Sequence, residues 1–96
     1  MTAVLAALGP RWDGPVVAAI EGGGQLRVAR RCADLADLLS AAAAGHGSVA
    51  LVGADLRGLT LSAMADLAQL GVAVVGVSPP GDDAAEARLW QLGVAA

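Results

Sequence analysis

Lysine, phenylalanine and tyrosine are absent from this sequence of 96 residues, and the only aromatic side chains are Trp12 and Trp90. A core must therefore be built from leucine, valine and alanine in closely packed elements. The sequence has six arginines and nine acidic residues, which gives a formal net charge of −3. This balance lacks the basic footprint of a nucleic-acid-binding surface. Arg27, Arg30 and Arg31 have no aromatic neighbour on which a base could stack, so we interpret them as a solvated edge.

Cysteine and histidine each occur once, as Cys32 and His46. A single cysteine cannot form an internal disulfide, and one residue of each kind falls short of the ligand count of a zinc site. No apolar run reaches the ~20 residues of a membrane span without glycine, proline or charge, and the N-terminus lacks a signal-peptide pattern. We therefore expect a cytoplasmic protein without a metal or other cofactor, with Cys32 as a small buried side chain.

Charged residues make up 16% of the sequence and hydrophobic residues 56%. The charged share is well below the ~25% of an average soluble domain. A chain of this length suffices for one domain, and we expect residues 1–96 to form a single one. The excess of apolar side chains indicates that part of the surface is covered by another chain or by a further segment.

Four short apolar runs have the character of strands buried in a parallel sheet. Each is followed by a segment that we interpret as a helix, and glycines mark the ends of three of these helices. The resulting order is β-α-β-α-β-α-β-α. The expected strands are Ala3–Leu8, Leu26–Arg30, Ser48–Ala54 and Val72–Val77, and the expected helices lie within residues 12–21, 33–44, 60–71 and 83–93.

Helical spacing predicts which side chains face the core. Thr60 is the expected cap of the third helix, Asp83 opens a capping box in the fourth, and Asp34 lies in the first turn of the second. The expected buried stripes are Leu35, Leu38, Leu39 and Ala42 in the second helix, Leu61, Met64 and Ala68 in the third, and Ala85, Leu89 and Leu92 in the fourth.

Residues 16–20 admit two interpretations. In the first, Asp13 caps a helix that has Pro15 in its first turn, where proline is tolerated. In the second, residues 16–20 form a strand that a hairpin loop, Glu21–Gln25, joins to Leu26–Arg30. We favour the helix, and the hairpin remains open at this point.

Alternating strands and helices predict a three-layer αβα fold of the flavodoxin or CheY-like kind, with a parallel sheet in the order 2-1-3-4. Leu26–Arg30 suits the polar edge of that sheet. The other edge, Val72–Val77, has no charge to protect it from pairing. We therefore expect a fifth strand to be missing, since Val94, Ala95 and Ala96 could begin such a strand but not complete it. Another chain or a dimer partner supplies it, or it is lost to truncation.

The stretch "VGADLRGLT", residues 52–60, places Asp55 at the carboxyl end of the third strand, and Ser78 follows the fourth. This arrangement resembles the receiver domains of response regulators, in which a phospho-accepting aspartate and a serine or threonine hold these positions. Receivers also have an acidic pair after the first strand, which binds Mg²⁺, and a lysine after the fifth. Here Leu8 and Gly9 stand where the acids belong. Because phosphoryl transfer to a carboxylate needs a cation, we interpret Asp55 and Ser78 as a vestigial phospho-acceptor position, with no catalytic residue and no metal ligand.

A closer resemblance is carried by "VARRCADLADLLSAAAAGHGSVALVGADLRGLT" and "LGVAVVGVSPPGDDAAEARLWQLGV". These segments look like the receiver-like N-terminal domain that precedes a MinD/ParA-type P-loop ATPase in actinobacteria, as in CpaE-like proteins of pilus assembly. The resemblance implies a pseudo-receiver that regulates such an ATPase in pilus assembly, septum placement or partitioning. The expected partner is the P-loop ATPase domain or a homodimer mate at the open sheet edge. Trp90, Arg88 and Leu92 form the candidate interaction surface.

Two other functions remain as alternatives. One is a phosphorylatable receiver that uses Asp55 with unusual metal ligation. The other is a small α/β enzyme in which Asp55 acts as nucleophile or base, although the sequence places no second acid, base or cation within obvious reach. Trp90 either covers the margin of the core or anchors a partner.

Overall fold

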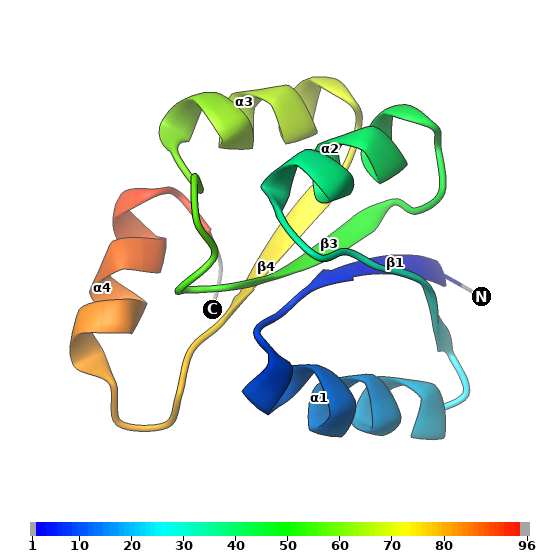
Figure 1. Cartoon of the computed structure of the whole chain (residues 1–96), viewed down its shortest axis with the longest axis horizontal. Coiled ribbons are helices and arrows are strands. Elements are labelled where there is room, and N and C mark those ends of the chain that lie inside the picture. The colour runs from blue at the N-terminus through cyan, green and yellow to red at the C-terminus, as the bar shows by residue number, and fades with distance from the viewer. Residues whose placement is uncertain (1, 95–96) are drawn as a thin grey trace.

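Four parallel strands and four helices alternate along the chain in the computed structural model, which describes residues 2–94 (Figure 1). The strands form one sheet in the order β2-β1-β3-β4. The predicted fold class and strand order are therefore confirmed. The elements are β1 (Thr2–Ala7), α1 (Pro10–Gly22), β2 (Leu26–Arg31), α2 (Leu35–Ala43), β3 (Val49–Gly53), α3 (Leu61–Gln69), β4 (Ala73–Val77) and α4 (Asp83–Gln91).

The helix interpretation of residues 16–20 is correct, but the helix begins earlier than expected. Gly9 is its N-cap residue, and Pro10 takes the first helical position. Proline is favoured there because its fixed φ suits the helix and its missing N–H would have no partner. The prediction of Asp13 as the cap was wrong. Asp13 lies in the first turn, and its carboxylate forms a salt bridge of 2.9 Å with Arg31 of β2.

Side-chain caps begin the other three helices. Asp34, Thr60 and Asp82 each accept a hydrogen bond from the backbone N–H three residues later, at 2.8, 3.2 and 3.0 Å. Thr60 was predicted in this role, whereas the cap of α4 is one residue before the predicted Asp83. The backbone N–H of Asp82 closes a turn on the carbonyl of Pro79, which leaves Asp82 outside the helix and free to cap it.

The buried face of α3 differs from the predicted stripe of Leu61, Met64 and Ala68. Ala63 and Leu67 are the buried residues, Met64 packs beside them, and Leu61 is 65% exposed. Leu61 is the first helical residue, and Ala68 is exposed as well. Helical spacing identifies residues that share a face, but it does not decide which of two adjacent apolar faces turns toward the sheet.

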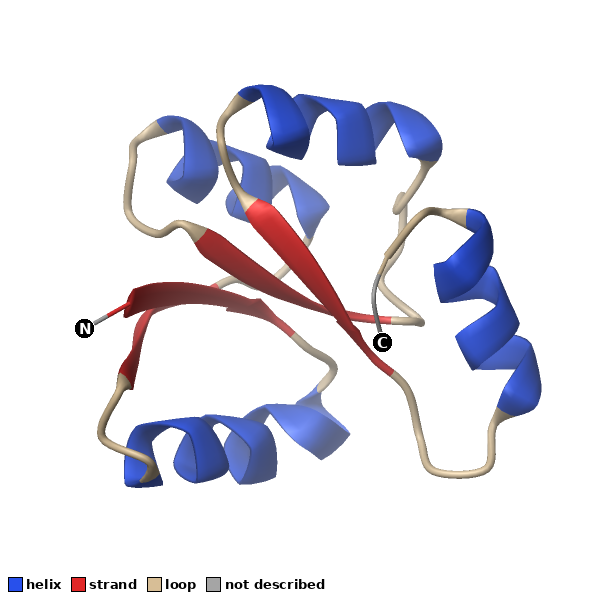
Figure 2. Ribbon diagram, turned by 180° about the vertical axis from the view of Figure 1, so that it is seen from behind, coloured by secondary structure: helices blue, strands red, loops and turns tan. Residues whose placement is uncertain are grey.

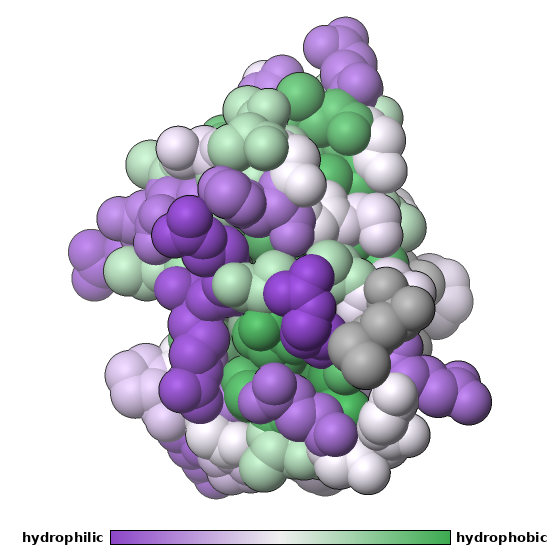
Figure 3. Space-filling model, turned by 90° about the vertical axis from the view of Figure 1, so that its right-hand side faces the viewer, coloured by the Kyte–Doolittle hydropathy of each residue, from purple (hydrophilic) through white to green (hydrophobic). Residues whose placement is uncertain are grey.

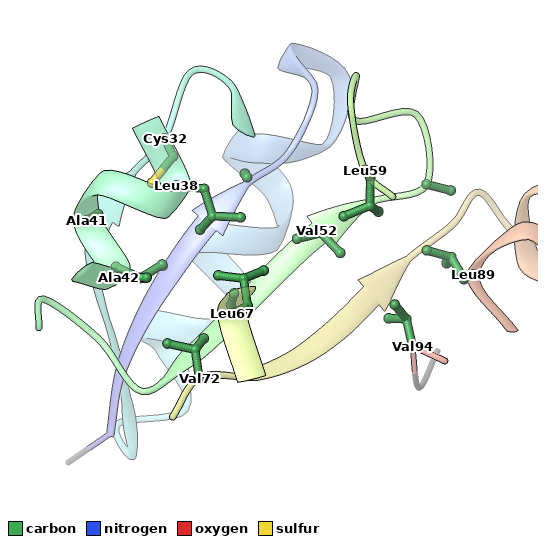
Figure 4. Close-up of a cluster of buried hydrophobic side chains, with 14 residues drawn as sticks. Cys32, Leu38, Ala41, Ala42, Val52, Leu59, Leu67, Val72, Leu89 and Val94 are labelled. Atoms are coloured by element: carbon green, nitrogen blue, oxygen red, sulfur yellow. The ribbon is translucent and has the colours of Figure 1, made fainter. Parts of the chain in front are cut away.

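One face of the sheet is covered by α2, α3 and α4. Leu5, Ala50 and Val52 of the central strands belong to one buried cluster with Leu38 of α2 and Leu67 of α3. Figure 4 shows Val52, Leu38 and Leu67 on this face. All five side chains are completely buried. This side of the sheet holds most of the hydrophobic core.

Helix α4 stands crosswise at the carboxyl end of β4 (Figure 1) and touches the strand at a glycine. A Cβ atom on Gly76 would lie 2.7 Å from Leu89 Cδ1 and 2.9 Å from Val94 Cγ1, so only glycine permits this approach. Ala85 and Leu92 pack beside Leu89, which agrees with the predicted inward face of α4.

The opposite face of the sheet carries one helix among the described residues. Helix α1 packs beneath β1 and β2 with Val17 buried, on the other side of the sheet from α2 and α3 (Figure 2). On this face β3 and β4 are less well covered, since Leu51 is half-buried and Val75 is 37% exposed. Parallel sheets normally have helices on both faces, so half of this face lacks a covering layer.

The two edge strands differ in charge. Strand β2 carries Arg27, Arg30 and Arg31, all exposed, and it has a register shift against β1. Hydrophilic side chains are prominent on the side of the molecule with the N-terminus (Figure 3). Strand β4 has no charged residue and is the last strand of the sheet within residues 2–94. An uncharged edge of this kind favours pairing with another strand.

The predicted start of a fifth strand falls partly outside the described residues. Val94 is buried but not in a strand, and the structure does not describe Ala95 and Ala96. In the described part of the chain, no helix combines the length and the apolar character that a membrane span requires.

Candidate functional site

A cleft of about 510 Å³ opens at the carboxyl ends of β3 and β4, between the start of α1 and α4. In open α/β sheets this is where ligands bind. Four charged side chains line it: Arg11 and Arg88 bring positive charge, Asp55 and Asp82 negative charge. Trp12 forms part of the wall, with the Arg11 guanidinium 4.9 Å from its ring centroid.

Asp55 is exposed, and its carboxylate lies across the ends of β3 and β1. A Cβ atom on Gly53 would come within 2.7 Å of Asp55 Oδ1, and one on Gly9 would lie 3.4 Å from Oδ2. The two glycines therefore leave the space that this carboxylate occupies. Gly9 is also the N-cap of α1 and offers no side-chain hydrogen bond to the helix. The Asp55 carboxylate thus stands near the N-terminal end of α1.

The position beside Asp55 at the end of β1 holds no acid. Gly9 has no side chain, and Leu8 is half-buried and apolar. Asp13, the nearest acid along the chain, is held by Arg31. Within residues 2–94, no three His, Cys, Asp or Glu side chains gather as metal ligands. In the cleft, Asp55 therefore shares the lining with one other acid, Asp82, and with two arginines, and no acid stands beside it at the end of β1.

Ser78 directly follows β4, whose last residue, Val77, pairs with Gly53 of β3. It therefore stands near the level of Asp55 along the sheet. Its side chain is half-buried and does not line the cleft, although its neighbours Val77 and Pro79 do. The structure thus brings Asp55 to the cleft but not Ser78.

The three predicted surface residues of α4 point in different directions. Arg88 lines the cleft, and Leu92 packs against the core. Trp90 is 65% exposed, and its indole N–H lies 3.5 Å from the Glu86 carboxylate. The alternative in which Trp90 covers the margin of the core is therefore wrong. This tryptophan faces solvent.

The sequence predicts that the loops 9–13 and 78–83 lie at the carboxyl edge, but it does not single out Arg11, Trp12 and Asp82 within them as residues of the cleft. The signal is positional, because these residues belong to the segments that follow β1 and β4. In a parallel sheet, such segments meet at the carboxyl edge. Their residue types carried no motif that would have singled them out.

Cys32 lies between β2 and α2, and its side chain is buried, as predicted. Burial raises the pKa of the thiol, the charges of Asp37 and Asp34 raise it further, and Arg30 opposes them. The thiolate is therefore disfavoured in the folded chain, so Cys32 is not an activated nucleophile.

We expect Cys32 to react with Ellman's reagent at pH 8 at least about tenfold more slowly in the folded protein than in denaturant. Because the folded pKa is raised, stability is fully present below the pKa of the unfolded thiol. It is lost as pH rises above that value, since only the unfolded chain then releases the proton. Denaturant titrations from pH 7 to 10 should show this loss, and Cys32→Ala should reduce it. Equal reactivity in both states would contradict the buried position.

Solved structures of similar fold include the signal receiver domain of the response regulator NarL from Mycobacterium tuberculosis. The comparison with this domain gives a TM-score of 0.75 and 21% sequence identity, and it covers 97% of the present chain and 78% of the receiver chain. A pilus assembly-related protein from Burkholderia pseudomallei gives a TM-score of 0.70 at 18% identity, over 98% of this chain and 74% of that one. No protein-family model matches the chain, and a search of curated proteins found no match. The two structural similarities establish a receiver-like fold.

Proposed function

We propose that residues 1–96 form a pseudo-receiver, a protein-interaction module that has kept the receiver architecture without its phosphoryl chemistry. The observation that supports this proposal is that Gly9, which has no side chain, lies beside the Asp55 carboxylate. The carboxylate follows β3, where the resemblance to receivers leads us to expect the phospho-acceptor. We propose no enzymatic activity and no cofactor for this chain.

The charges in the cleft support this proposal. A phosphoryl donor would bring further negative charge to Asp55, and a bound cation normally offsets that charge. Arg11 and Arg88 are positive, but a guanidinium donates hydrogen bonds and does not coordinate oxygen atoms as a metal ion does. Asp82 caps α4 and is engaged with the N–H of Ala85.

The proposed partner is a P-loop ATPase domain of the MinD or CpaE type. Two features support this choice: the sequence resemblance of residues 28–60 and 70–94, and the structural similarity to a pilus assembly-related protein. The proposed contact is α4, where Trp90 offers a large exposed aromatic side chain of the kind that dominates binding energy at interfaces.

Incubation with acetyl phosphate and Mg²⁺ tests the absence of phosphoryl chemistry. We expect the intact mass to remain unchanged in the wild type and in Asp55→Asn. A gain of one phosphoryl group in the wild type that Asp55→Asn abolishes would show that the chain is a working receiver.

Binding to a purified MinD/CpaE-type ATPase tests the partner. We expect Trp90→Ala to weaken binding by at least about tenfold, since a hot-spot aromatic contributes 2 kcal/mol or more. Leu61→Ala is the matched control, because Leu61 is as exposed as Trp90 but belongs to α3. Equal loss in both variants, or no binding by the wild type, would reject this contact.

A further inference from the structure

The solvent-facing side of α1 has an unusual composition for a surface helix. From Gly14 to Ile20 there is no charged or polar side chain, and Pro15 and Ala19 are exposed. Its charged residues lie at the ends, where Asp13 is already bound to Arg31. A helix that is apolar all round belongs in an interior rather than at a surface.

One flank of α1 is hollowed. A groove of about 560 Å³ runs along it, lined by Trp12, Val16 and Ile20 of the helix and, beyond the end of the helix, by Gln25 and Leu26 at the start of β2. The opposite flank of the helix faces β2, as a separate hollow lined by Val17, Glu21 and residues of that strand shows. Trp12 lines both this groove and the cleft at the carboxyl edge.

We use the name trough for the space beside α1 and beneath β3 and β4. Its floor is Leu51, Val75 and Val77, which alternate with the buried residues of the same strands and so point to the face on which α1 packs. Its side wall is the apolar flank of α1. No charged residue lies on the floor, so the trough suits an apolar helix.

We propose that the trough is filled by α1 of a second copy of this chain, and that the second copy receives α1 of the first in the same way. A two-fold axis parallel to the strands, halfway between two facing sheets, satisfies this arrangement. In this dimer, α1 lies beneath β1 and β2 of its own sheet and, at the same time, against the face of β3 and β4 of the partner's sheet. An isologous contact of this kind closes on itself as a dimer.

This symmetry brings matching surfaces together. The two copies of α1 run parallel and side by side, so Val16 and Ile20 meet their counterparts across the axis. The exposed side of α1, with Pro15 and Ala19, rests on the partner's uncovered strands. In the dimer, the uncharged face of α1 thus covers the partner's exposed strands, and those strands bury that face of the helix.

The carboxyl edge does not oppose this arrangement. Rotation places the start of the second copy's α1 at the mouth of the cleft. The second copy's Arg11 then approaches a cleft lined by two acids, Asp55 and Asp82, and by two arginines, so the charges there are balanced.

The buried area reaches the lower range of specific interfaces. A helix of 13 residues is about 20 Å long and 10 Å wide, so half of its cylindrical surface is about 300 Å². Each copy buries that half-surface and a similar area of trough, which sums to roughly 1,200 Å² for the pair. Specific interfaces begin at about this size, so we expect a reversible dimer with a dissociation constant in the micromolar range.

Sedimentation equilibrium over a concentration series tests the proposal. The chain mass is 9.4 kDa, and we expect the wild type to approach twice that value at high concentration. Ala19→Arg places a charge in the contact, and we expect it to weaken the dimer at least about 100-fold. Arginine is a good helix former and Ala19 is exposed, so the monomer should keep its fold, as circular dichroism will show.

Ala65→Arg is the matched control, because Ala65 is an exposed alanine in the middle of α3 and should leave the dimer intact. Val75→Arg on the floor of the trough should act like Ala19→Arg. A wild type that stays monomeric throughout the series would overturn the proposal. So would a dimer that persists in Ala19→Arg, since it would have to form elsewhere, such as at the edge of β4.

Discussion

Leu67→Ala is expected to lower the free energy of unfolding by about 3 kcal/mol, within the range of about 2–5 kcal/mol for buried leucines. Leu67 is completely buried between α3 and the sheet, so its removal loses apolar burial and leaves a cavity. The total free energy of unfolding of a domain of this length is about 5–14 kcal/mol. The melting temperature should therefore fall by more than about 10 °C. Urea titration measures the change directly.

Leu61→Ala supplies the control within the same helix. Leu61 is 65% exposed, so truncating it should change the free energy of unfolding by no more than about 0.5 kcal/mol. The pair of variants also distinguishes the observed face of α3 from the face that helical spacing suggested. Similar losses in both variants would contradict the observed orientation of α3.

Gly9→Asp is expected to create a Mg²⁺ site beside Asp55. A Cβ atom at residue 9 lies 3.4 Å from Asp55 Oδ2, so the new carboxylate stands beside the existing one. Mg²⁺ binds to one or two carboxylates and keeps several waters. At ten times its dissociation constant, the ion should stabilise the variant by about 1.4 kcal/mol. That corresponds to a rise of roughly 6–11 °C in melting temperature.

Gly9→Asn is the matched control, since it adds a side chain of the same size without the charge. Neither this variant nor the wild type should respond to Mg²⁺ beyond the effect of ionic strength. Without the ion, the two carboxylates of Gly9→Asp repel each other, so Mg²⁺ should also relieve that cost. If Gly9→Asp melts at the same temperature with and without Mg²⁺, the residue at position 9 does not determine whether Mg²⁺ binds at Asp55.

The fold was largely predictable because its signals are local. Short apolar runs and terminal glycines separated strands from helices, and the handedness of crossovers reduced the possible strand orders. The errors arose where two local choices were nearly equal. Asp82 and Asp83 could both cap α4, and α3 offered two apolar faces, only one of which Leu67 occupies. The geometry of the preceding turn decides which residue caps a helix, and packing on the sheet decides which face is buried. The sequence of the helix alone determines neither.

The candidate site was predictable only in part. The sequence located Asp55 at the end of a strand, since acidic residues after apolar runs are easily recognised. It did not show that the carboxylate lies over Gly53 and Gly9, because Gly9 and Asp55 are far apart in the chain and meet only in the sheet. It also did not show that Trp90 points to solvent, because a tryptophan at a helix end suits either environment.

The close contact of α4 with Gly76 affects how easily this helix separates from the sheet. Leu89 is the only residue of this helix that is fully buried, and it rests on the backbone of a strand at the edge of the described sheet. Few apolar contacts must break for α4 to open, so its amides should exchange with solvent long before those of β1 and β3. A partner that binds α4 would then stabilise this helix without disturbing the core.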